Sequence, residues 1–245
     1  TLSNLRGDER ARYVQQMFSR IAGRYDLMNR IMTAGQDLRW RKEVIRRADL
    51  PRQGRLLDLG AGTGDLTREA ARQHSSLHIV AADFTLDMMR VGRSRPQPRP
   101  LANGQITWCG ADANRLPFPD HAFDAVVSAF LLRNLGDLPR SLAEQYRVLK
   151  PGGRIVALDT TPPPRNLLRP AMEFHLYTVI PALGSLIAGQ AEAYRYLPES
   201  TTGFLEPERL ALRLMEAGFQ QVGFRRLMFG AVAIYWGVKP STVAG

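Results

Sequence analysis

The chain of 245 residues has almost no cysteine and no uninterrupted apolar run of membrane-spanning length. Its single cysteine, Cys109, excludes an internal disulfide, so the fold does not depend on an oxidising compartment. The four histidines are scattered and no zinc-type spacing of cysteine and histidine occurs, so we expect no metal site. The charged, polar N-terminus predicts no secretory signal. A hydrophobic content of 44% is enough for a sizeable core and predicts one domain over residues 1–245, with room for an elaborated insertion.

Lysine is also scarce, because the net charge of +10 is carried almost entirely by arginine. The lysines are Lys42, Lys150 and Lys239. A positive charge of this size attracts anionic surfaces, either membrane lipid or nucleic acid. Coding bias together with solvated helix faces explains the same composition. No run of interleaved aromatic and basic residues, as single-strand binders use, is present, so the charge by itself selects neither partner.

The most informative stretch reads R-L-L-D-L-G-A-G-T-G-D-L-T from Arg55. An apolar run broken by one acid, Asp58, is typical of a buried strand that ends at a functional edge. Alternate glycines follow at Gly60, Gly62 and Gly64. They allow a sharp turn and a close approach of backbone to ligand, and a helical pattern then begins at Asp65. Strand, glycine turn and helix form the first unit of a nucleotide-binding α/β domain.

The spacing of the glycines limits the class of ligand that this loop can bind. A dinucleotide-binding loop has its third glycine where Asp65 stands, one residue after Gly64. An acid there would face an incoming pyrophosphate at the helix N-terminus, which is unfavourable. A ligand with an amino group and a sulfonium would tolerate Asp58 and Asp65. The loop resembles that of class I S-adenosylmethionine-dependent methyltransferases, and a plain glycine turn is the alternative.

Strands alternate with helices over residues 55–160, which predicts a parallel, doubly wound sheet. Ligands in such sheets bind at the carboxyl ends of the strands. Polar residues stand at five predicted strand ends: Asp58, Asp83, Asp112, Ser128 and Asp159. Their agreement at one edge of the sheet predicts a single ligand site there.

Two of these acids have specific expected roles. Asp83 lies about twenty residues beyond the glycine loop, where an acid typically binds ribose hydroxyls, and Phe84 beside it can pack on an adenine face. The alternative for Asp83 is an N-cap of the helix predicted over 85–91. Asp112 is a candidate acceptor from the adenine exocyclic amine, with the Ala113 backbone N–H as a donor. Turn chemistry is the alternative for Asp112.

The rest of the chain divides by pattern into segments around a cofactor-binding core at 55–160. They are N-terminal helices at 8–50, a helical insertion at 162–205, and a closing helix and hairpin at 207–240. The spacing of apolar residues over 8–48 predicts two amphipathic helices joined at Thr33 to Gly35. Residues 94–104, rich in proline and arginine, predict a surface connection.

The insertion contains an apolar stretch, residues 171–188, whose length approaches that of a membrane span. Glu173, His175 and Pro181 interrupt it, so we expect one or two helices that cover the ligand end of the sheet. Leu183 and Ile187 are its candidates for contact with lipid.

Five stretches together resemble the UbiE/COQ5 family of quinone-ring C-methyltransferases. They are Y-D-L-M-N from Tyr25, L-D-L-G-A-G-T-G-D-L-T from Leu57, L-P-F-P-D from Leu116, L-R-N from Leu132 running on to R-V-L-K-P-G-G at Arg147, and Y-R-Y-L-P-E-S from Tyr194. The first and last are the most particular to the family, and the match covers roughly residues 10–240.

The resemblance implies a class I, Rossmann-like methyltransferase fold, a seven-stranded and mostly parallel sheet whose last strand is antiparallel. It implies S-adenosylmethionine as cofactor, and the candidate cofactor-binding residues are Asp58, Gly60, Gly62, Thr63, Asp83, Asp112 and Ala113. The implied reaction is methylation of a ring carbon of a polyprenylated quinol in menaquinone or ubiquinone synthesis, demethylmenaquinol to menaquinol. We expect Arg133 to stabilise the ionising quinol and Asn134 to orient it, and a structural pair that caps the following turn is the alternative. His175 is a further candidate base, although a lone histidine on an apolar helix is more often a packed residue.

The sequence departs from the family pattern at several positions. Asp37 stands where the family usually has His, and Thr33 where it has Ser. D-T-T at Asp159 to Thr161 replaces E-x-S, and A-F-L-L-R-N from Ala129 replaces S-F-G-L-R-N. These departures touch the acceptor side, so a naphthoquinol and a benzoquinol both stay open as acceptors.

Because a polyprenyl quinol lies in the bilayer, we expect a cytoplasmic protein with peripheral contact at the inner face of the membrane and no nucleic-acid partner. Three alternatives are another small aromatic or lipid acceptor, a nucleic-acid methyltransferase without a recognisable recognition module, and a cofactor-binding protein without turnover. The sequence does not determine tail length or oligomeric state.

Overall fold

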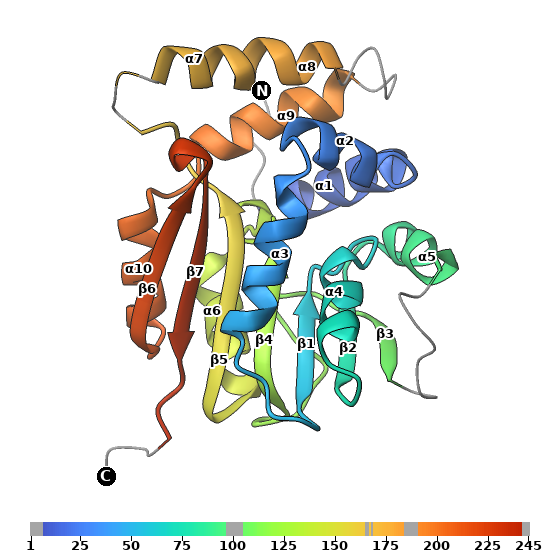
Figure 1. Cartoon of the computed structure of the whole chain (residues 1–245), viewed down its shortest axis with the longest axis vertical. Helices are drawn as coiled ribbons and strands as arrows, with labels where there is room; N and C mark the ends of the chain where they lie inside the picture. Colours follow the sequence, from blue (N-terminus) through green and yellow to red (C-terminus); the bar gives the residue numbers. More distant parts are fainter. Residues whose placement is uncertain (1–6, 97–104, 165–166, 168, 184–190, 242–245) are drawn as a thin grey trace.

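The computed structural model describes residues 7–96, 105–164, 167, 169–183 and 191–241. The strands in this part of the chain are β1 (Arg55–Leu59), β2 (His78–Asp83), β3 (Ile106–Gly110), β4 (Phe123–Ala129), β5 (Leu149–Thr160), β6 (Gln220–Leu227) and β7 (Val232–Val238). They form one sheet in the order β3-β2-β1-β4-β5-β7-β6, in which β7 runs antiparallel to both neighbours (Figure 1). The predicted mostly parallel, doubly wound sheet with an antiparallel last strand is confirmed.

Helices cover both faces of the sheet. In front of it in Figure 1 lie α3 (Gln36–Arg47) and α4 (Asp65–Gln73), behind it lie α6 (Leu138–Val148) and α10 (Pro207–Glu216), and α5 (Leu86–Ser94) packs beside β2 and β3. Successive strand residues point to opposite faces. Leu56 therefore joins the core under α3 and α4, whereas Leu57 joins the core under α6 and α10.

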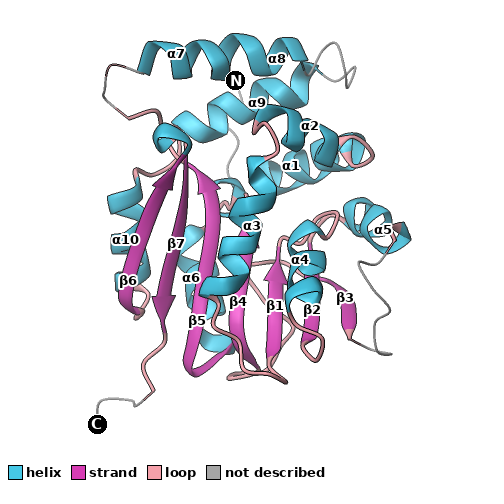
Figure 2. Cartoon of the chain, in the orientation of Figure 1, coloured by secondary structure: helices cyan, strands magenta, loops and turns pink. Residues whose placement is uncertain are grey.

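A group of helices lies beyond the carboxyl ends of the parallel strands (Figure 2). It consists of α1 (Gly7–Ile21), α2 (Tyr25–Met32), α7 (Arg169–Phe174), a π-helical turn at His175–Val179, α8 (Ile180–Leu183) and α9 (Ala191–Thr202). These helices share a small core of their own, formed by Met17, Ile21, Met28, Ile180 and Tyr196. The insertion therefore covers the ligand end of the sheet together with the N-terminal helices, as predicted.

The N-terminal segment differs from the prediction, since it folds into three helices instead of two. The break at Thr33–Gly35 is present, and a second turn at 22–24 separates α1 from α2. Gly23 lies in that turn, and glycine costs about 1 kcal/mol in a helix interior relative to alanine.

The apolar pattern predicts a fifth strand from Arg154 to Asp159, but β5 begins five residues earlier, at Leu149. The K-P-G-G stretch belongs to the strand because its backbone pairs with the end of β7. The N–H of Gly152 donates to the Lys239 carbonyl, and the N–H of Lys239 donates to the Gly153 carbonyl. Gly152 has φ +78°, which favours glycine in this kinked part of the strand.

Two predictions fall partly outside the described residues. The surface connection at 94–104 is described only as far as residue 96, and the apolar stretch at 171–188 only as far as residue 183, so Ile187 lies outside. In the part of the chain that is described, no helix is both long enough and apolar enough to cross a membrane.

Candidate active site

A cavity opens at the carboxyl ends of β1, β2 and β4, at the point where the strand order reverses. All seven residues predicted to bind the cofactor line it, namely Asp58, Gly60, Gly62, Thr63, Asp83, Asp112 and Ala113. The structure thus brings together residues that are as far as 55 positions apart in the chain, from 58 to 113.

The glycine loop lines this first cavity. Gly60 has φ +70° and Gly62 has φ +56°. A Cβ at Gly60 would approach Leu131 Cδ1 to 2.9 Å, so a side chain there would force Leu131 to shift in addition to straining the backbone.

Asp83 holds the glycine loop and the start of α5 at the same time. Its Oδ2 accepts the Gly62 N–H at 2.7 Å, and its Oδ1 accepts the Thr85 N–H at 2.6 Å. Burial raises the pKa of this carboxyl, and the two backbone donors oppose the shift. The N-cap of α5 is Thr85, so Asp83 accepts from the capping residue without being the cap itself, and its binding of ribose hydroxyls stays a prediction.

Asp58 is the acid that lacks a full set of partners. It is 1% exposed, and its Oδ2 accepts from the Thr67 hydroxyl at 2.5 Å, whereas its Oδ1 has no hydrogen-bond partner. Burial raises its pKa to about 6, against the lowering effect of Thr67 and Arg41. A buried, unpaired carboxylate oxygen facing a cavity fits the ammonium group of an amino-acid-bearing ligand such as S-adenosylmethionine.

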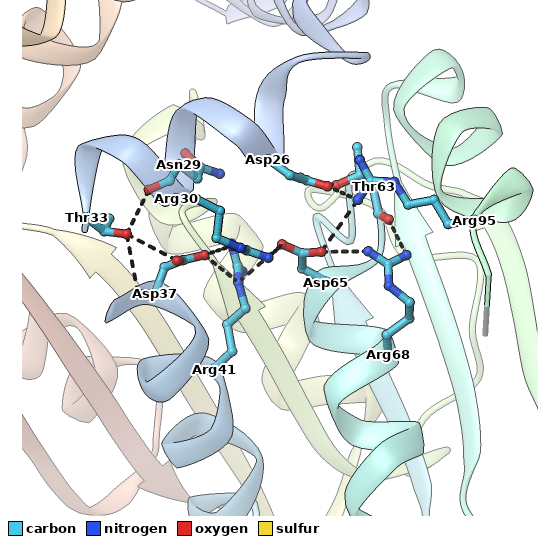
Figure 3. A network of polar contacts seen from close by, with 10 residues as sticks. All are labelled: Asp26, Asn29, Arg30, Thr33, Asp37, Arg41, Thr63, Asp65, Arg68 and Arg95. Carbon is cyan, nitrogen blue, oxygen red and sulfur yellow. Dashed lines mark hydrogen bonds and ion pairs between the residues drawn. The ribbon is translucent and has the colours of Figure 1, made fainter. Parts of the chain in front are cut away.

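Asp65 lies at the same cavity but is neutralised by arginines (Figure 3). Its carboxylate pairs with Arg30 Nη2 at 2.7 Å and Arg68 Nη2 at 2.6 Å, with Arg41 and Arg95 within 4 Å. Burial acts to raise its pKa, and Arg41 and Arg30 more than offset this, so the pKa is lowered. Repulsion between the glycine loop and a pyrophosphate would therefore come mainly from Asp58, because the charge of Asp65 is offset by the arginines.

The same network fastens the N-terminal helices over the cavity. The Thr63 hydroxyl donates to Asp26 of α2 at 2.6 Å, and Arg95 also pairs with Asp26. Gln15 of α1 donates to the Phe84 carbonyl at 3.1 Å. Thr63 thus lines the cavity as predicted, while its hydroxyl is already used to hold α2.

Asp112 and Ala113 line the first cavity just after the end of β3, and their binding of an adenine edge stays a prediction. Asp112 is exposed, and its Oδ1 accepts the Asn114 N–H at 2.9 Å, which is the turn interaction expected of this residue type. Ala113 is 7% exposed. The Asp112 carboxylate has a second oxygen available for a ligand.

A second cavity, of about 360 Å³, lies beside the first under the insertion. Its lining is mainly apolar and comes from α2, from the helices of the insertion and from the start of β7. Phe130 lines both cavities, and its φ of +61° is uncommon for a bulky residue. Two of the departures from the family pattern, Thr33 and Thr161, line the second cavity.

The two predicted catalytic residues flank Phe130 at the junction of the cavities. Arg133 lines the second cavity, where Nη1 lies 2.5 Å from Asp159 Oδ1 and the guanidinium lies 5.4 Å from the Phe130 ring centroid. Asn134 lines the first cavity, donates to the Phe130 carbonyl at 3.0 Å and accepts from the Tyr196 hydroxyl at 3.0 Å. Burial acts to lower the pKa of Arg133, and the Asp159 carboxylate more than offsets it, so the pKa is raised and the charge persists.

Sequence reasoning did not assign Tyr25, Phe130 or Tyr196 to the site. Tyr25 lines the first cavity and Tyr196 fixes Asn134. The Y-D-L-M-N and Y-R-Y-L-P-E-S stretches mark two of these residues in the sequence, but both lie far from the glycine loop in the chain. Only the packing of α2 and α9 above the sheet brings them to it.

Comparisons with known proteins agree with this geometry. The family model described as "ubiE/COQ5 methyltransferase family" matches residues 6–239. The "Ubiquinone/menaquinone biosynthesis C-methyltransferase UbiE" of Desulfotalea psychrophila is 46% identical over 226 residues, 92% of this chain and 90% of that protein. The "Demethylmenaquinone methyltransferase" of Thermus thermophilus is 44% identical over 224 residues, 91% of this chain and 100% of that protein.

Solved structures with low sequence identity show the same fold. A methyltransferase of Thermotoga maritima described as SAM-dependent has a TM-score of 0.63 at 17% identity, covering 91% of this chain and 98% of its own. Phosphoethanolamine N-methyltransferase 2 of Haemonchus contortus, in complex with S-adenosylmethionine, has a TM-score of 0.61 at 17% identity, covering 82% of this chain and 52% of its own.

Proposed function

Because the chain belongs to the UbiE/COQ5 methyltransferase family, we propose that it methylates a ring carbon of demethylmenaquinol with S-adenosylmethionine as cofactor. The observation that carries the proposal is the pair of cavities meeting at Phe130. One cavity has acids suited to an amino group and a ribose, and the other has an apolar lining suited to a ring. A methyl transfer requires the two reactants to meet at such a junction.

The residues of the first cavity bind and align the cofactor. Asp58 accepts from the amino group, Asp83 from the ribose hydroxyls, and Asp112 with the Ala113 N–H bonds the adenine edge. When bound, S-adenosylmethionine supplies a sulfonium methyl group that is already activated. The chain therefore has to align the acceptor and hold its charge.

On the acceptor side we assign the electrostatic role to Arg133 and the orienting role to Asn134. An aromatic carbon becomes a good nucleophile when a neighbouring hydroxyl ionises, so the site must hold a phenolate. The Arg133 guanidinium stays charged and lies at the junction, in an environment of low dielectric where its field is strong. Arginine is too basic to remove the proton itself, so another group or water accepts it.

The test of the function uses purified protein, S-adenosylmethionine labelled in the methyl group, and a panel of reduced quinones. We expect label in a demethylnaphthoquinol and less in a benzoquinol of equal tail length. Label in the benzoquinol alone would reassign the acceptor. Label in no quinol, with cofactor bound, would contradict the proposal and favour a binding protein without turnover.

The raised pKa of Asp58 predicts a pH-dependent affinity for the cofactor. A cationic ligand favours the ionised carboxylate, so binding must expel a proton below pH about 6. The affinity for S-adenosylmethionine should therefore fall as the pH drops from about 6 toward 4 and should level off above it. Calorimetry across this pH range measures the affinity. In Asp58→Asn the affinity should depend on pH much less, and the remaining dependence should come from Asp83.

The raised pKa of Asp58 affects the stability of the ligand-free protein in the opposite direction: stability falls, whereas cofactor affinity rises, as the pH increases. The folded state binds this proton more tightly than the unfolded chain, whose pKa is near 3.8. As the pH rises from about 3.8 to above 6, the ionisation of Asp58 therefore lowers the free energy of unfolding, by about 3 kcal/mol in total. Asp58→Asn should stabilise the free protein above pH about 6 while it weakens cofactor binding. A variant less stable than wild type at pH 8 would contradict the assignment.

We further propose that the protein meets its acceptor at a membrane surface. Aromatic side chains on and beside the second cavity are exposed, at 61% for Phe174, 50% for Tyr177 and 75% for Phe229. A net charge of +10 adds attraction to anionic lipid. An apolar surface and a basic charge together give reversible peripheral binding, whereas neither suffices alone.

Flotation with liposomes tests the membrane proposal. Binding should require anionic lipid, fall as salt rises and weaken in Phe174→Ser/Phe229→Ser. The matched control is Leu212→Ser/Met215→Ser on α10, where both side chains are similarly exposed, at 55% and 50%. Protein that stays unbound on anionic vesicles at low salt would contradict the proposal, and the insertion would then act only as a cover of the site.

A further inference from the structure

The lining of the second cavity is mainly apolar but also includes several polar side chains. Besides apolar side chains, its lining contains Asn29, Arg133, His175 and four threonines. A volume of about 360 Å³ is within the range of small-molecule sites, and an apolar wall favours an aromatic ring.

Most of the polar groups in this lining already have partners within the protein. The Thr33 hydroxyl donates to the Asn29 carbonyl at 2.7 Å, and the Thr160 and Thr201 hydroxyls bond each other at 3.0 Å. The Thr161 hydroxyl donates to a backbone carbonyl, and Arg133 pairs with Asp159. Each of these four interactions is made within the protein.

Asn29 and His175 also line this cavity and make no such side-chain bond at one buried atom each. The side-chain Nδ2 of Asn29 and the Nε2 of His175 have no hydrogen-bond partner, and Asn29 is only 7% exposed. A buried donor without a partner costs about 1–3 kcal/mol, so folding alone gives no reason to place one here. Both atoms belong to residues on the wall of the same cavity, one on α2 and one on the insertion.

The backbone around His175 gives a second indication of a built site. His175 begins a π-helical turn, His175–Val179, between α7 and α8. Such turns insert one residue into a helix and occur frequently at functional sites. The insertion thereby departs from regular helix at a residue that lines the cavity.

We infer that Asn29 and His175 form the recognition site for the oxygen atoms of the acceptor ring, each making a hydrogen bond to a ring oxygen. This inference rests on the proposed function, because it places the acceptor quinol in the second cavity. A reduced quinone combines an apolar ring with two hydroxyls, which matches an apolar cavity with two unpartnered polar atoms. Arg133 lies on the same wall, so a ring held in this way has the guanidinium beside it.

Ligand binding without turnover tests the inference. The probe is 1,4-dihydroxynaphthalene, kept reduced under anaerobic conditions, with S-adenosylhomocysteine in the first cavity and naphthalene as the probe without oxygens. In Asn29→Leu and His175→Phe we expect the Kd for 1,4-dihydroxynaphthalene to rise about tenfold or more, the loss of one buried hydrogen bond. The Kd for naphthalene and the Kd for S-adenosylhomocysteine should not change.

Thermal stability separates recognition from a structural role. Replacing an unpartnered polar group by an apolar one of similar size should leave Tm unchanged or raise it in both variants. Ser141→Ala on α6 is the matched control, because it removes a buried hydroxyl that bonds the Gln145 side chain at 3.2 Å and lines neither cavity. Its Tm should fall by a few degrees while its Kd for 1,4-dihydroxynaphthalene stays at the wild-type value.

Two results would overturn the inference. One is wild-type affinity for 1,4-dihydroxynaphthalene in both variants, and the other is an equal loss of affinity for both probes, which would indicate damage to the shape of the cavity. Either can occur while wild-type protein still methylates demethylmenaquinol, so the proposed function would survive. Intact and selective binding without methylation by the wild type would instead overturn the proposed function.

Discussion

Replacing Arg133 by leucine should lower the free energy of unfolding by about 3–5 kcal/mol, because it leaves the buried Asp159 carboxylate without its cation. Asp159 is 0% exposed and Arg133 only 7%, so water does not replace the lost partner. Turnover should also fall strongly, since the variant lacks the charge proposed to hold the phenolate. Urea unfolding and single-turnover methyl transfer measure the two effects.

A second substitution separates the two roles of Arg133. In Arg133→Leu/Asp159→Asn the uncompensated charge is gone. The asparagine oxygen can still accept one of the two backbone N–H groups, of residue 133 or 160, that separate oxygens of Asp159 accept. Most of the stability should return, because removing both members of a buried ion pair is far less costly than removing one. Methyl transfer should stay low with cofactor affinity near wild type. Recovery of turnover along with stability would show that Arg133 acts only through Asp159.

Asp83→Ala should weaken S-adenosylmethionine binding by about 1–3 kcal/mol, or roughly tenfold to a hundredfold in Kd. The loss has two sources, the missing acceptor for the ribose hydroxyls and the release of the Gly62 and Thr85 N–H groups that shape the loop. Titration calorimetry with the cofactor measures it, and unchanged affinity would contradict the ribose assignment.

Two variants accompany Asp83→Ala. Asp83→Asn keeps one acceptor oxygen and should lose less affinity than the alanine variant. Asp112→Ala is a matched control at the neighbouring strand end, where the carboxylate is exposed and accepts the Asn114 N–H. Because water competes at an exposed site, its loss should be smaller than that of Asp83→Ala.

Local patterns in the sequence were enough for the sheet and for the cofactor side of the site. The apolar run before Asp58 and the alternate glycines after it specify a strand and a turn within a dozen residues. The acids at positions 83 and 112 then follow at strand ends, and parallel strands place their carboxyl ends at one edge. All these residues line one cavity because a short-range pattern and a single topological rule determine their positions.

The acceptor side could not be derived in the same way, because it consists of contacts between segments that are distant in the chain. The partner of Arg133 is Asp159, 26 residues away, and the partner of Asn134 is Tyr196, 62 residues away. No periodicity links such residues, and a side chain's charge does not reveal which opposite charge will lie beside it.

The sequence by itself determined the order of strands and helices, the glycine loop and the acids at the strand ends, since each depends on backbone geometry over a few residues. Only the tertiary structure decided which polar groups are already satisfied. Asp65 is neutralised by arginines of α2, α3, α4 and the segment after α5, whereas Asp58 and Asn29 keep a buried atom without a partner. The difference arises because burial and pairing are properties of the packed whole, and a buried polar atom without a partner is costly unless a ligand completes it.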